Sequence, residues 1–228
     1  MNIITIIPAR GGSIGILKKN IRIVGGLPLI VHSIRHSINA KMVDRTIVST
    51  DDDEISKISK NNGAEVIKRP AEIRGDKAPS EQALKHVINT LKNENYKVDI
   101  VVFLQPTSPI RRPNQIDNAI KLMLKDDSDS CFSACVEHFT GRWKKNKNGY
   151  AKPINYQLSN RPMRQDYPEY YLENGNICIF KTHILEKTGN RLGGKITIFP
   201  MDNIESLQID KEQDLILIDT LINNIQNS

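Results

Sequence analysis

The sequence has little of what stabilises secreted domains or spans membranes. Only three of its 228 residues are cysteines, and none has a histidine at metal-ligand spacing, so we expect reduced core thiols at Cys131, Cys135 and Cys178. No run approaches the roughly 18 apolar residues of a transmembrane helix. The apolar N-terminal run ends at Pro8, too early for a signal peptide. These absences predict a cytoplasmic protein without a membrane partner.

Aromatic residues are also scarce, at 5% of the chain with one tryptophan, and no repeat of solenoid length occurs. The 39% hydrophobic content can form one sizeable core, so we expect one domain over residues 1–228. The formal net charge of +6 indicates an anionic partner. The cations are scattered, and no recognition helix, zinc spacing or RNA-binding aromatic pair accompanies them. A nucleotide or acidic metabolite is therefore expected, and nucleic acid is not.

Strands and helices alternate along the chain. Strands are expected at residues 3–7, 45–49, 64–68, 99–104, 130–136, 176–181 and 195–199, and helices at 28–40, 52–61, 80–95, 113–125 and 211–225. This order predicts an α/β fold with a three-layer, mainly parallel, Rossmann-like sheet, whose ligands bind beyond the carboxyl ends of the strands. Asp51 or a neighbour is expected to cap the second helix, and Asp210 the last one.

A glycine-rich loop follows the first buried strand. Residues 8–20 read PARGGSIGILKKN, so small residues are followed by the cations Lys18 and Lys19. Such a loop can bring backbone N–H groups close to a phosphate. Neither a Walker A loop nor a dinucleotide-binding G-x-G-x-x-G motif fits the spacing. By spacing alone, a phosphate site and a plain glycine-rich turn remain open.

Polar residues gather at four places where strands are expected to end. They are Arg10 with Lys19, Ser49 with Asp51, Gln105 with Thr107 and Ser108, and Asp210 before the last helix. Their convergence at one edge of a sheet favours a binding site over isolated caps. No Ser-His-Asp or Cys-His set accompanies them. We therefore expect chemistry in which cations and a metal position charged substrates, as in phosphoryl or nucleotidyl transfer.

Residues 137–171 differ from the rest of the chain. This stretch contains Trp143, several tyrosines and prolines and many cations, without a clear period. Aromatic and cationic residues in a long irregular segment favour an arm that covers another surface over a disordered linker. We expect it to pack on a second subunit.

Several motifs resemble those of the acylneuraminate cytidylyltransferases, which make CMP-activated acidic sugars. The matching stretches are PARGGS with KN at residues 8–20, VSTDDDEIS (48–56), RPAEIRGDKAPS (69–80), LQPTSPIR (104–111), RPMRQD (161–166), ENG (173–175) and IDKEQDL (209–215). The resemblance implies a nucleotide-diphospho-sugar transferase-like fold and a homodimer with a protruding dimerisation arm. It also implies CMP transfer from CTP to the anomeric hydroxyl of a sialic acid or related 3-deoxy-keto sugar, releasing pyrophosphate.

The resemblance also assigns roles to individual residues. Arg10, Lys19 and Asp210 would be catalytic, with Asp210 as a ligand of Mg²⁺, for which Mn²⁺ is a possible substitute. The implied nucleotide-binding residues are Arg10, Gly11, Gly12, Ser13, Lys19, Asn20, Arg69 and Ser80. The implied sugar-binding residues are Gln105, Thr107, Ser108, Arg142, Arg164, Gln165 and Asn174, with Arg142 reaching its ligand across the dimer.

Three positions depart from the family pattern. Ile14 and Leu172 replace usual cations, and Gln208 replaces the first carboxylate of an Asp-x-Asp pair. Lys18 is a candidate to supply the contact missing at Ile14. These departures favour an acidic sugar other than N-acetylneuraminate. Two alternatives remain: a nucleotidyltransferase that joins another nucleoside triphosphate to a sugar 1-phosphate, and a nucleotide-binding paralogue without turnover.

Overall fold

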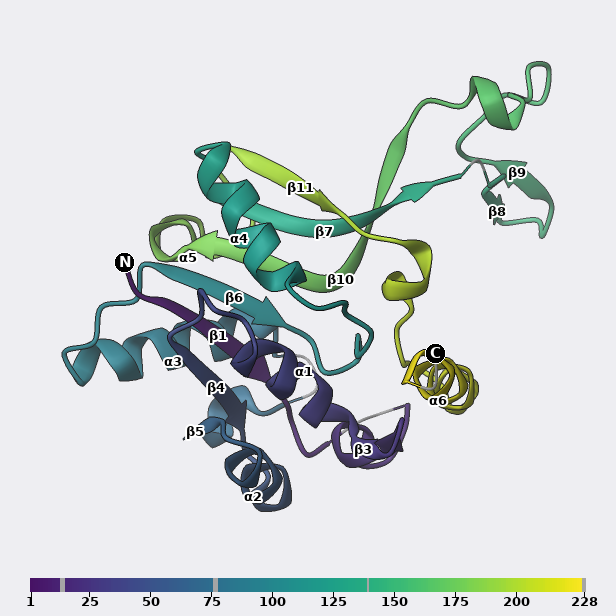
Figure 1. Ribbon diagram of the computed structural model, residues 1–228. Coiled ribbons are helices and arrows are strands. Elements are labelled where there is room, and N and C mark those ends of the chain that lie inside the picture. The colour runs from purple at the N-terminus through teal and green to yellow at the C-terminus, as the bar shows by residue number, and fades with distance from the viewer. Residues whose placement is uncertain (13–14, 76–77, 139, 227–228) are drawn as a thin grey trace.

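A seven-stranded sheet forms the centre of the protein, in the order β11-β7-β10-β6-β1-β4-β5. The computed structural model describes residues 1–12, 15–75, 78–138 and 140–226. The sheet strands are β1 (Ile3–Pro8), β4 (Arg45–Thr50), β5 (Glu65–Lys68), β6 (Ile100–Leu104), β7 (Ser130–Glu137), β10 (Tyr170–Lys181) and β11 (Ile196–Pro200). Only β10 runs antiparallel to its neighbours β6 and β7. The expected mainly parallel sheet is confirmed (Figure 1).

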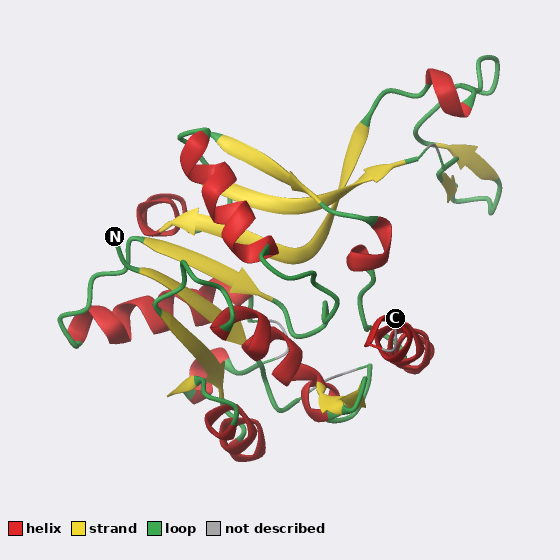
Figure 2. Ribbon diagram, in the orientation of Figure 1, coloured by secondary structure: helices red, strands yellow, loops and turns green. Residues whose placement is uncertain are grey.

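Helices cover both faces of the sheet (Figure 2). They are α1 (Leu29–Ile38), α2 (Asp53–Asn61), α3 (Ser80–Asn93), α4 (Gln115–Lys125), α5 (Thr182–Thr188) and α6 (Glu212–Gln226). Short 3-10 turns occur at η1 (Lys19–Ile21), η2 (Ala71–Ile73), η3 (Arg164–Asp166) and η4 (Asn203–Ser206). As expected, an aspartate caps the second helix, because the carboxylate of Asp52 accepts a 2.9 Å hydrogen bond from the N–H of Ile55.

The central strand β1 explains the three-layer arrangement. Its residues alternate in the face to which they point, as the two-residue repeat of a strand requires. Ile3 and Ile7 belong to the core beneath α1 and α4, whereas Ile4 and Ile6 belong to the core beneath α3 and α5. All four isoleucines are buried. A strand apolar on both faces is thus covered by helices on both sides.

The last helix and a small hairpin form a third apolar cluster beside the sheet. The hairpin consists of β2 (Ile23–Val24) and β3 (Leu27–Pro28). Val24 packs with Leu215, Ile218 and Ile222 of α6.

Asp210 is not the N-cap of the last helix, contrary to the expectation from the sequence. The helix begins at Glu212, and the carboxylate of Asp214 accepts hydrogen bonds from the backbone N–H groups of Asp210 and Lys211.

The region expected to be an irregular arm is partly sheet. Strand β10 begins at Tyr170, and its first residues pair with the end of β7. The sequence hid this pairing because the register of the two strands shifts between Glu173 and Cys178, and Gly175 there has a positive φ of 63°. The arm proper, residues 138–169, projects from this pair of strands and carries the hairpin β8 (Trp143–Lys145) and β9 (Ala151–Pro153) (Figure 1). Helix α5 was also missed.

Two further features concern the cysteines and the helices. The cysteines Cys131, Cys135 and Cys178 are buried and free, which confirms that they are core thiols. Within the described ranges, no helix has both the length and the apolar character needed to cross a bilayer.

Candidate active site

One cavity of about 390 Å³ lies at the carboxyl ends of β1 and β6. Eight residues predicted from the sequence line it: Arg10, Lys19, Asn20, Arg69, Ser80, Gln105, Thr107 and Asp210. They come from six separate places in the chain. Of the residues expected to converge at this edge of the sheet, Arg10, Lys19, Gln105, Thr107 and Asp210 line the cavity, whereas Ser49 and Asp51 do not. The sequence analysis missed the apolar wall, which includes Phe103 and Pro106, and the Ala78–Pro79 segment before α3.

The first loop lies against both α2 and the C-terminal segment. The N–H of Gly11 donates to the Asp51 carboxylate at 3.2 Å. A side chain at Gly15 would lie 2.7 Å from the carbonyl oxygen of Asp210, so glycine is required there by the close approach of two backbones. Apart from its chain neighbours, no atom of the described residues lies within 4 Å of a side chain placed at Gly12. Ser13 and Ile14 lie outside the described residues.

Lys19 connects the loop to the C-terminal segment. Its ammonium group donates to the carbonyl of Ile209 at 3.0 Å and to the carboxylate of Asp210 at 3.3 Å. The Lys19 side chain is 16% exposed, whereas that of Asp210 is 68% exposed. Lys18 instead pairs with Glu54 at 2.6 Å and does not line the cavity, so its suggested substitution for a cation at position 14 receives no support.

Asn20 and Arg69 are held rigidly in the cavity wall. The side-chain amide of Asn20 donates to the carbonyl of Arg10 at 3.0 Å. The guanidinium of Arg69 donates to the carbonyl of Ser49 at 2.8 Å and is largely buried. Burial lowers the pKa of Arg69, and the carboxylate of Asp51 opposes this shift. These contacts pre-organise two hydrogen-bonding side chains for a ligand.

Helix α3 starts at the cavity with Ser80, immediately after Pro79. Among the described residues, no side chain caps this end of the helix. Helix N-termini carry unsatisfied N–H groups and a partial positive charge, which favour anions. Together with Arg10, Lys19 and Arg69, this helix end gives the cavity a cationic character suited to a polyanion.

Gln105 and Thr107 occupy the wall beyond β6. The Thr107 hydroxyl donates to the side-chain oxygen of Gln105 at 3.4 Å. A side chain at Gly175 would lie 3.1 Å from the side-chain nitrogen of Gln105, so Gln105 packs against the backbone of β10. The side-chain amide of Gln208 donates a hydrogen bond to the backbone carbonyl of Asn174 on β10. An aspartate at position 208 could not donate this bond, so Gln208 stabilises β10 here.

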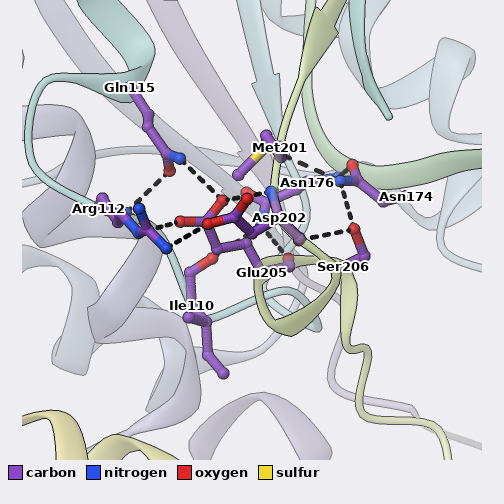
Figure 3. Close-up of polar contacts among 9 residues, drawn as sticks. All are labelled: Ile110, Arg112, Gln115, Asn174, Asn176, Met201, Asp202, Glu205 and Ser206. Carbon is purple, nitrogen blue, oxygen red and sulfur yellow. Dashed lines mark hydrogen bonds and ion pairs between the residues drawn. The ribbon is translucent and has the colours of Figure 1, made fainter. Parts of the chain in front are cut away.

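Two residues expected to bind the sugar are buried away from the cavity. Ser108 is fully buried, and its hydroxyl has no hydrogen-bond partner within the described ranges. Asn174 is 3% exposed, and its amide donates to Ser206 at 3.0 Å and contacts the sulfur of Met201 (Figure 3). Neither residue lines the cavity, which corrects the expectation of direct contact within this chain.

Three further residues expected to bind the sugar belong to the arm. Arg142 forms an ion pair with Glu137 and lines a separate cavity of about 340 Å³. Gln165 is exposed, and its amide contacts the sulfur of Met163. The side chain of Arg164 lies outside the described structure. Within one chain, Arg142 and Gln165 do not line the main cavity.

A polar network that was not predicted from the sequence joins the segment before α4 to β10 and η4 (Figure 3). Arg112 forms ion pairs with Asp202 and with Glu205, the latter at 2.7 Å. Gln115 also donates to Glu205, at 2.9 Å. Asn176 donates to the carbonyls of Ile110 and Glu205, at 2.8 and 2.7 Å. Asn176 thus ties Ile110 to η4, whereas Arg112 forms its ion pairs with the carboxylates of Asp202 and Glu205. Apart from Ile110, these residues belong to none of the motifs found in the sequence.

Solved structures share this fold over nearly the whole chain. CMP:2-keto-3-deoxy-manno-octonic acid synthetase, solved with CTP, superposes with a TM-score of 0.73 at 18% identity, covering 99% of this chain and all of that one. The 4-diphosphocytidyl-2C-methyl-D-erythritol synthase of Anaerococcus prevotii gives 0.67 at 14% identity, covering 97% and 98%. The chain therefore has the same α/β fold as these two structures.

The family follows from sequence comparison. A family model described as Cytidylyltransferase matches residues 4–227, and the chain belongs to this family. It is 34% identical to N-acylneuraminate cytidylyltransferase A of Danio rerio, over 93% of this chain and 49% of that protein. It is 29% identical to Post-translational flagellin modification protein B of Campylobacter coli and 28% identical to CMP-N,N'-diacetyllegionaminic acid synthase of Campylobacter jejuni, each over 96% of this chain and 94% of the relative. The chain spans about half the length of the vertebrate relatives.

Proposed function

We propose that the protein transfers CMP from CTP to the anomeric hydroxyl of an acidic 3-deoxy-keto sugar. The hydroxyl oxygen would form a bond to the α-phosphorus, the bond to the β-phosphate oxygen would break, and pyrophosphate would leave. The observation that carries the proposal is the single cavity lined by Arg10, Lys19, Gln105 and Asp210. Family membership and relatives named as synthases of CMP-activated acidic sugars support the choice of nucleotide and acceptor.

The cationic half of the cavity suits the triphosphate. Arg10 and Lys19 lie on the glycine-rich loop, and Lys19 is held at the C-terminal segment. We assign these two cations to the phosphates, where they would stabilise charge that develops as pyrophosphate departs. Gly11, Gly12 and Ser13 would complete the loop around the phosphates, although the Gly11 N–H is bonded to Asp51 in this structure. Asn20, Arg69 and Ser80 would contact the nucleoside.

The residues present fit a Mg²⁺ ion shared with the phosphates. Asp210 offers an exposed carboxylate at the cavity. Among the described residues, no group of three or more histidine, cysteine, aspartate or glutamate side chains could hold a metal ion. Mg²⁺ commonly binds through one or two carboxylates plus substrate phosphates and water, so one carboxylate is sufficient. When bound, the ion would neutralise phosphate charge, and we expect Mn²⁺ to substitute for it.

A homodimer would complete the acceptor half of the site. Gln105 and Thr107 lie in the cavity, whereas Arg142 and Gln165 lie on the arm. The arm exposes large apolar side chains, including Trp143, Tyr150 and Leu158, which need a surface to cover them. We therefore propose that the arm packs on a second copy and that its cations approach that copy's acidic sugar. A cytoplasmic location stays a prediction.

Pyrophosphate release provides the direct test. The protein would be incubated with Mg²⁺ and each of the four nucleoside triphosphates, against a panel of sialic, legionaminic and octulosonic acids and sugar 1-phosphates. We expect release with CTP and at least one sugar acid. Release only with a sugar 1-phosphate would overturn the acceptor assignment. CTP binding without release for any acceptor, with Mg²⁺ or Mn²⁺, would instead indicate a nucleotide-binding paralogue.

A further inference from the structure

Arg111 is a buried cation that touches three elements around the cavity. The residue is 6% exposed. Its guanidinium donates to the hydroxyl of Ser33 on α1 at 3.1 Å, to the carbonyl of Gln105 beyond β6 at 3.3 Å, and to the carbonyl of Asn176 on β10 at 2.8 Å. All three acceptors are uncharged. Arg111 does not line the main cavity, so it would act on a ligand only through the residues that it holds.

The charge of Arg111 is not neutralised by an acid. Across the described part of the chain, no carboxylate forms an ion pair with it, whereas its neighbour Arg112 pairs with both Asp202 and Glu205. Burial lowers the pKa of Arg111 to about 9, which leaves the guanidinium charged at neutral pH. Burying a charge away from water costs free energy, and no carboxylate among the described residues offsets that cost by an ion pair. The three hydrogen bonds of the guanidinium offset part of it, and all three hold groups of α1, β10 and the segment after β6.

The contacts of Arg111 converge on Gln105. One guanidinium nitrogen, Nη2, donates both to Gln105 and to Asn176, so it fixes the spacing between the end of β6 and the irregular part of β10. The residue before Asn176 is Gly175. A Cβ atom at Gly175 would lie 3.1 Å from the side-chain nitrogen of Gln105, so the Gln105 side chain packs closely against the backbone of β10. Gln105 is consequently held at its carbonyl by Arg111 and along its side chain by the strand that Arg111 anchors.

We infer that Arg111 is a positioning residue for the acceptor half of the site. By holding the Gln105 carbonyl and the Asn176 carbonyl together, it fixes the direction in which the Gln105 amide enters the cavity. This inference rests on the proposed function, in which Gln105 contacts the sugar acid. The nucleotide half depends on other anchors, because Lys19 is held by Ile209 and Asp210, and Asn20 is bonded to Arg10. Arg111 should thus affect the acceptor more than CTP.

The first test compares Arg111→Met with Arg112→Met in steady-state kinetics. Misplacing a contacting group by about 1 Å can cost about 100-fold in rate, so we expect kcat/KM for the acceptor to fall about 10- to 100-fold in Arg111→Met. The KM for CTP should stay within about twofold, and Arg112→Met should change neither value by more than about twofold. An equal loss for CTP and acceptor would overturn the inference. If Arg111→Met fails to fold, Arg111→Lys takes its place, because lysine keeps the charge and loses the forked geometry. We then expect the same result: a fall in kcat/KM for the acceptor with little change in the KM for CTP.

A double-mutant cycle with Gln105→Ala separates positioning from a general structural effect. If Arg111 acts through the Gln105 side chain, Arg111→Met should change the acceptor kcat/KM by less than about threefold once that side chain is absent. Fully additive losses would overturn the inference. Where Arg111→Met does not fold, Arg111→Lys takes its place in the cycle.

A readout without turnover distinguishes this inference from the proposed function. In ¹⁵N-labelled protein, the side-chain amide signal of Gln105 can be assigned by its absence in Gln105→Ala. We expect Arg111→Met, or Arg111→Lys in its place, to shift this signal, and Arg112→Met to leave it in place. An unshifted signal in the Arg111 variant would overturn the inference, whether or not the wild type releases pyrophosphate. Absence of pyrophosphate release by the wild type with every substrate pair would overturn the proposed function alone.

Discussion

The cavity and the arm use cations in opposite ways. At the cavity, Lys19 is 16% exposed and Arg69 is 8% exposed, and each donates to a backbone carbonyl of a distant segment. On the arm, Lys144, Lys145 and the other lysines of the β8–β9 hairpin are exposed to solvent. The first arrangement fixes charge before a ligand arrives, which reduces the reorganisation needed in a reaction. The second leaves charge free to meet a separate molecule.

The same contrast holds for apolar side chains. Every residue of β6 is buried, and the strand ends directly at the cavity. On the arm, Trp143 meets Tyr156 edge to face at 5.8 Å, but Trp143 remains 48% exposed. The cavity is thus supported by the core, whereas the aromatic contact of Trp143 on the arm is local and leaves the ring half exposed. The following predictions test whether function depends on the first region and assembly on the second.

The largest effect is expected at Lys19. Replacing Lys19 with alanine should lower kcat by at least about 100-fold, because it removes a fixed cation from the charge that develops on the leaving phosphates. Turnover of CTP with the best acceptor measures this effect, with circular dichroism to verify folding. Lys18→Ala is the matched control, since Lys18 pairs with Glu54 and does not line the cavity. An equal fall in kcat in the two variants would show that Lys19 has no specific role in stabilising the leaving phosphates.

Asp210 provides a second test within the cavity. Asp210→Asn keeps the size of the side chain but removes the only charge that we assign to the metal, so kcat should fall at least about 100-fold. Raising the Mg²⁺ concentration should restore part of the rate. Glu212→Gln is the control, because Glu212 pairs with Arg22 at 3.0 Å and does not line the cavity. A normal rate and an unchanged Mg²⁺ dependence in Asp210→Asn would exclude the carboxylate from the site.

The sequence predicted these cavity residues because short apolar runs in it indicate the order of the strands and helices. The apolar runs of β1 and β6 identified central strands, and parallel strands end at a common edge. Arg10, Lys19, Gln105 and Asp210 could therefore be brought together without knowing any distance. The Gly15 contact with the Asp210 backbone shows the limit of this reasoning, since only coordinates reveal which two backbones approach closely.

The buried polar residues were not predictable in the same way. Ser108 and Asn174 belong to motifs that resemble those of the family, yet their side chains are buried behind the cavity. A motif shows that a residue is part of a site region, but not whether its side chain points to the ligand or to the core. Arg111 illustrates the same point, because its three acceptors lie 78, 6 and 65 residues away in the chain.

The stability of the protein should depend on pH through His36 of α1. Burial lowers its pKa to about 3, and the charge of Arg111 and the neighbouring His32 add to this. The unfolded chain binds a proton near pH 6.5, so the stabilisation is complete above that pH and is lost as pH falls toward 3. Between about pH 7 and pH 5 we expect a loss of about 2 kcal/mol in the free energy of unfolding.

Urea titrations of wild type and His36→Gln at both pH values measure this loss. The variant should retain less than about half of the pH-dependent change, since glutamine does not titrate in this range. His138→Gln, at the exposed base of the arm, is the matched control and should keep the wild-type change. Identical pH dependence in all three proteins would show that other groups are responsible.

The smallest effect on stability is expected from removing the β8–β9 hairpin. The N–H of Ile154 donates to the carbonyl of Arg142 at 2.9 Å, so the hairpin ends are adjacent and a short Gly-Ser turn can replace residues 143–153. Because these residues are mostly exposed and separate from the sheet, the free energy of unfolding of the monomer unit should change by about 0.5 kcal/mol or less. If the proposed dimer forms, sedimentation should nevertheless change from twice the 25.8 kDa chain mass to the mass of one shortened chain, and the KM for the acceptor should rise. A shortened protein that still sediments as the wild-type dimer would place the dimer contact elsewhere, and the exposed aromatic residues of the arm would then need a different partner.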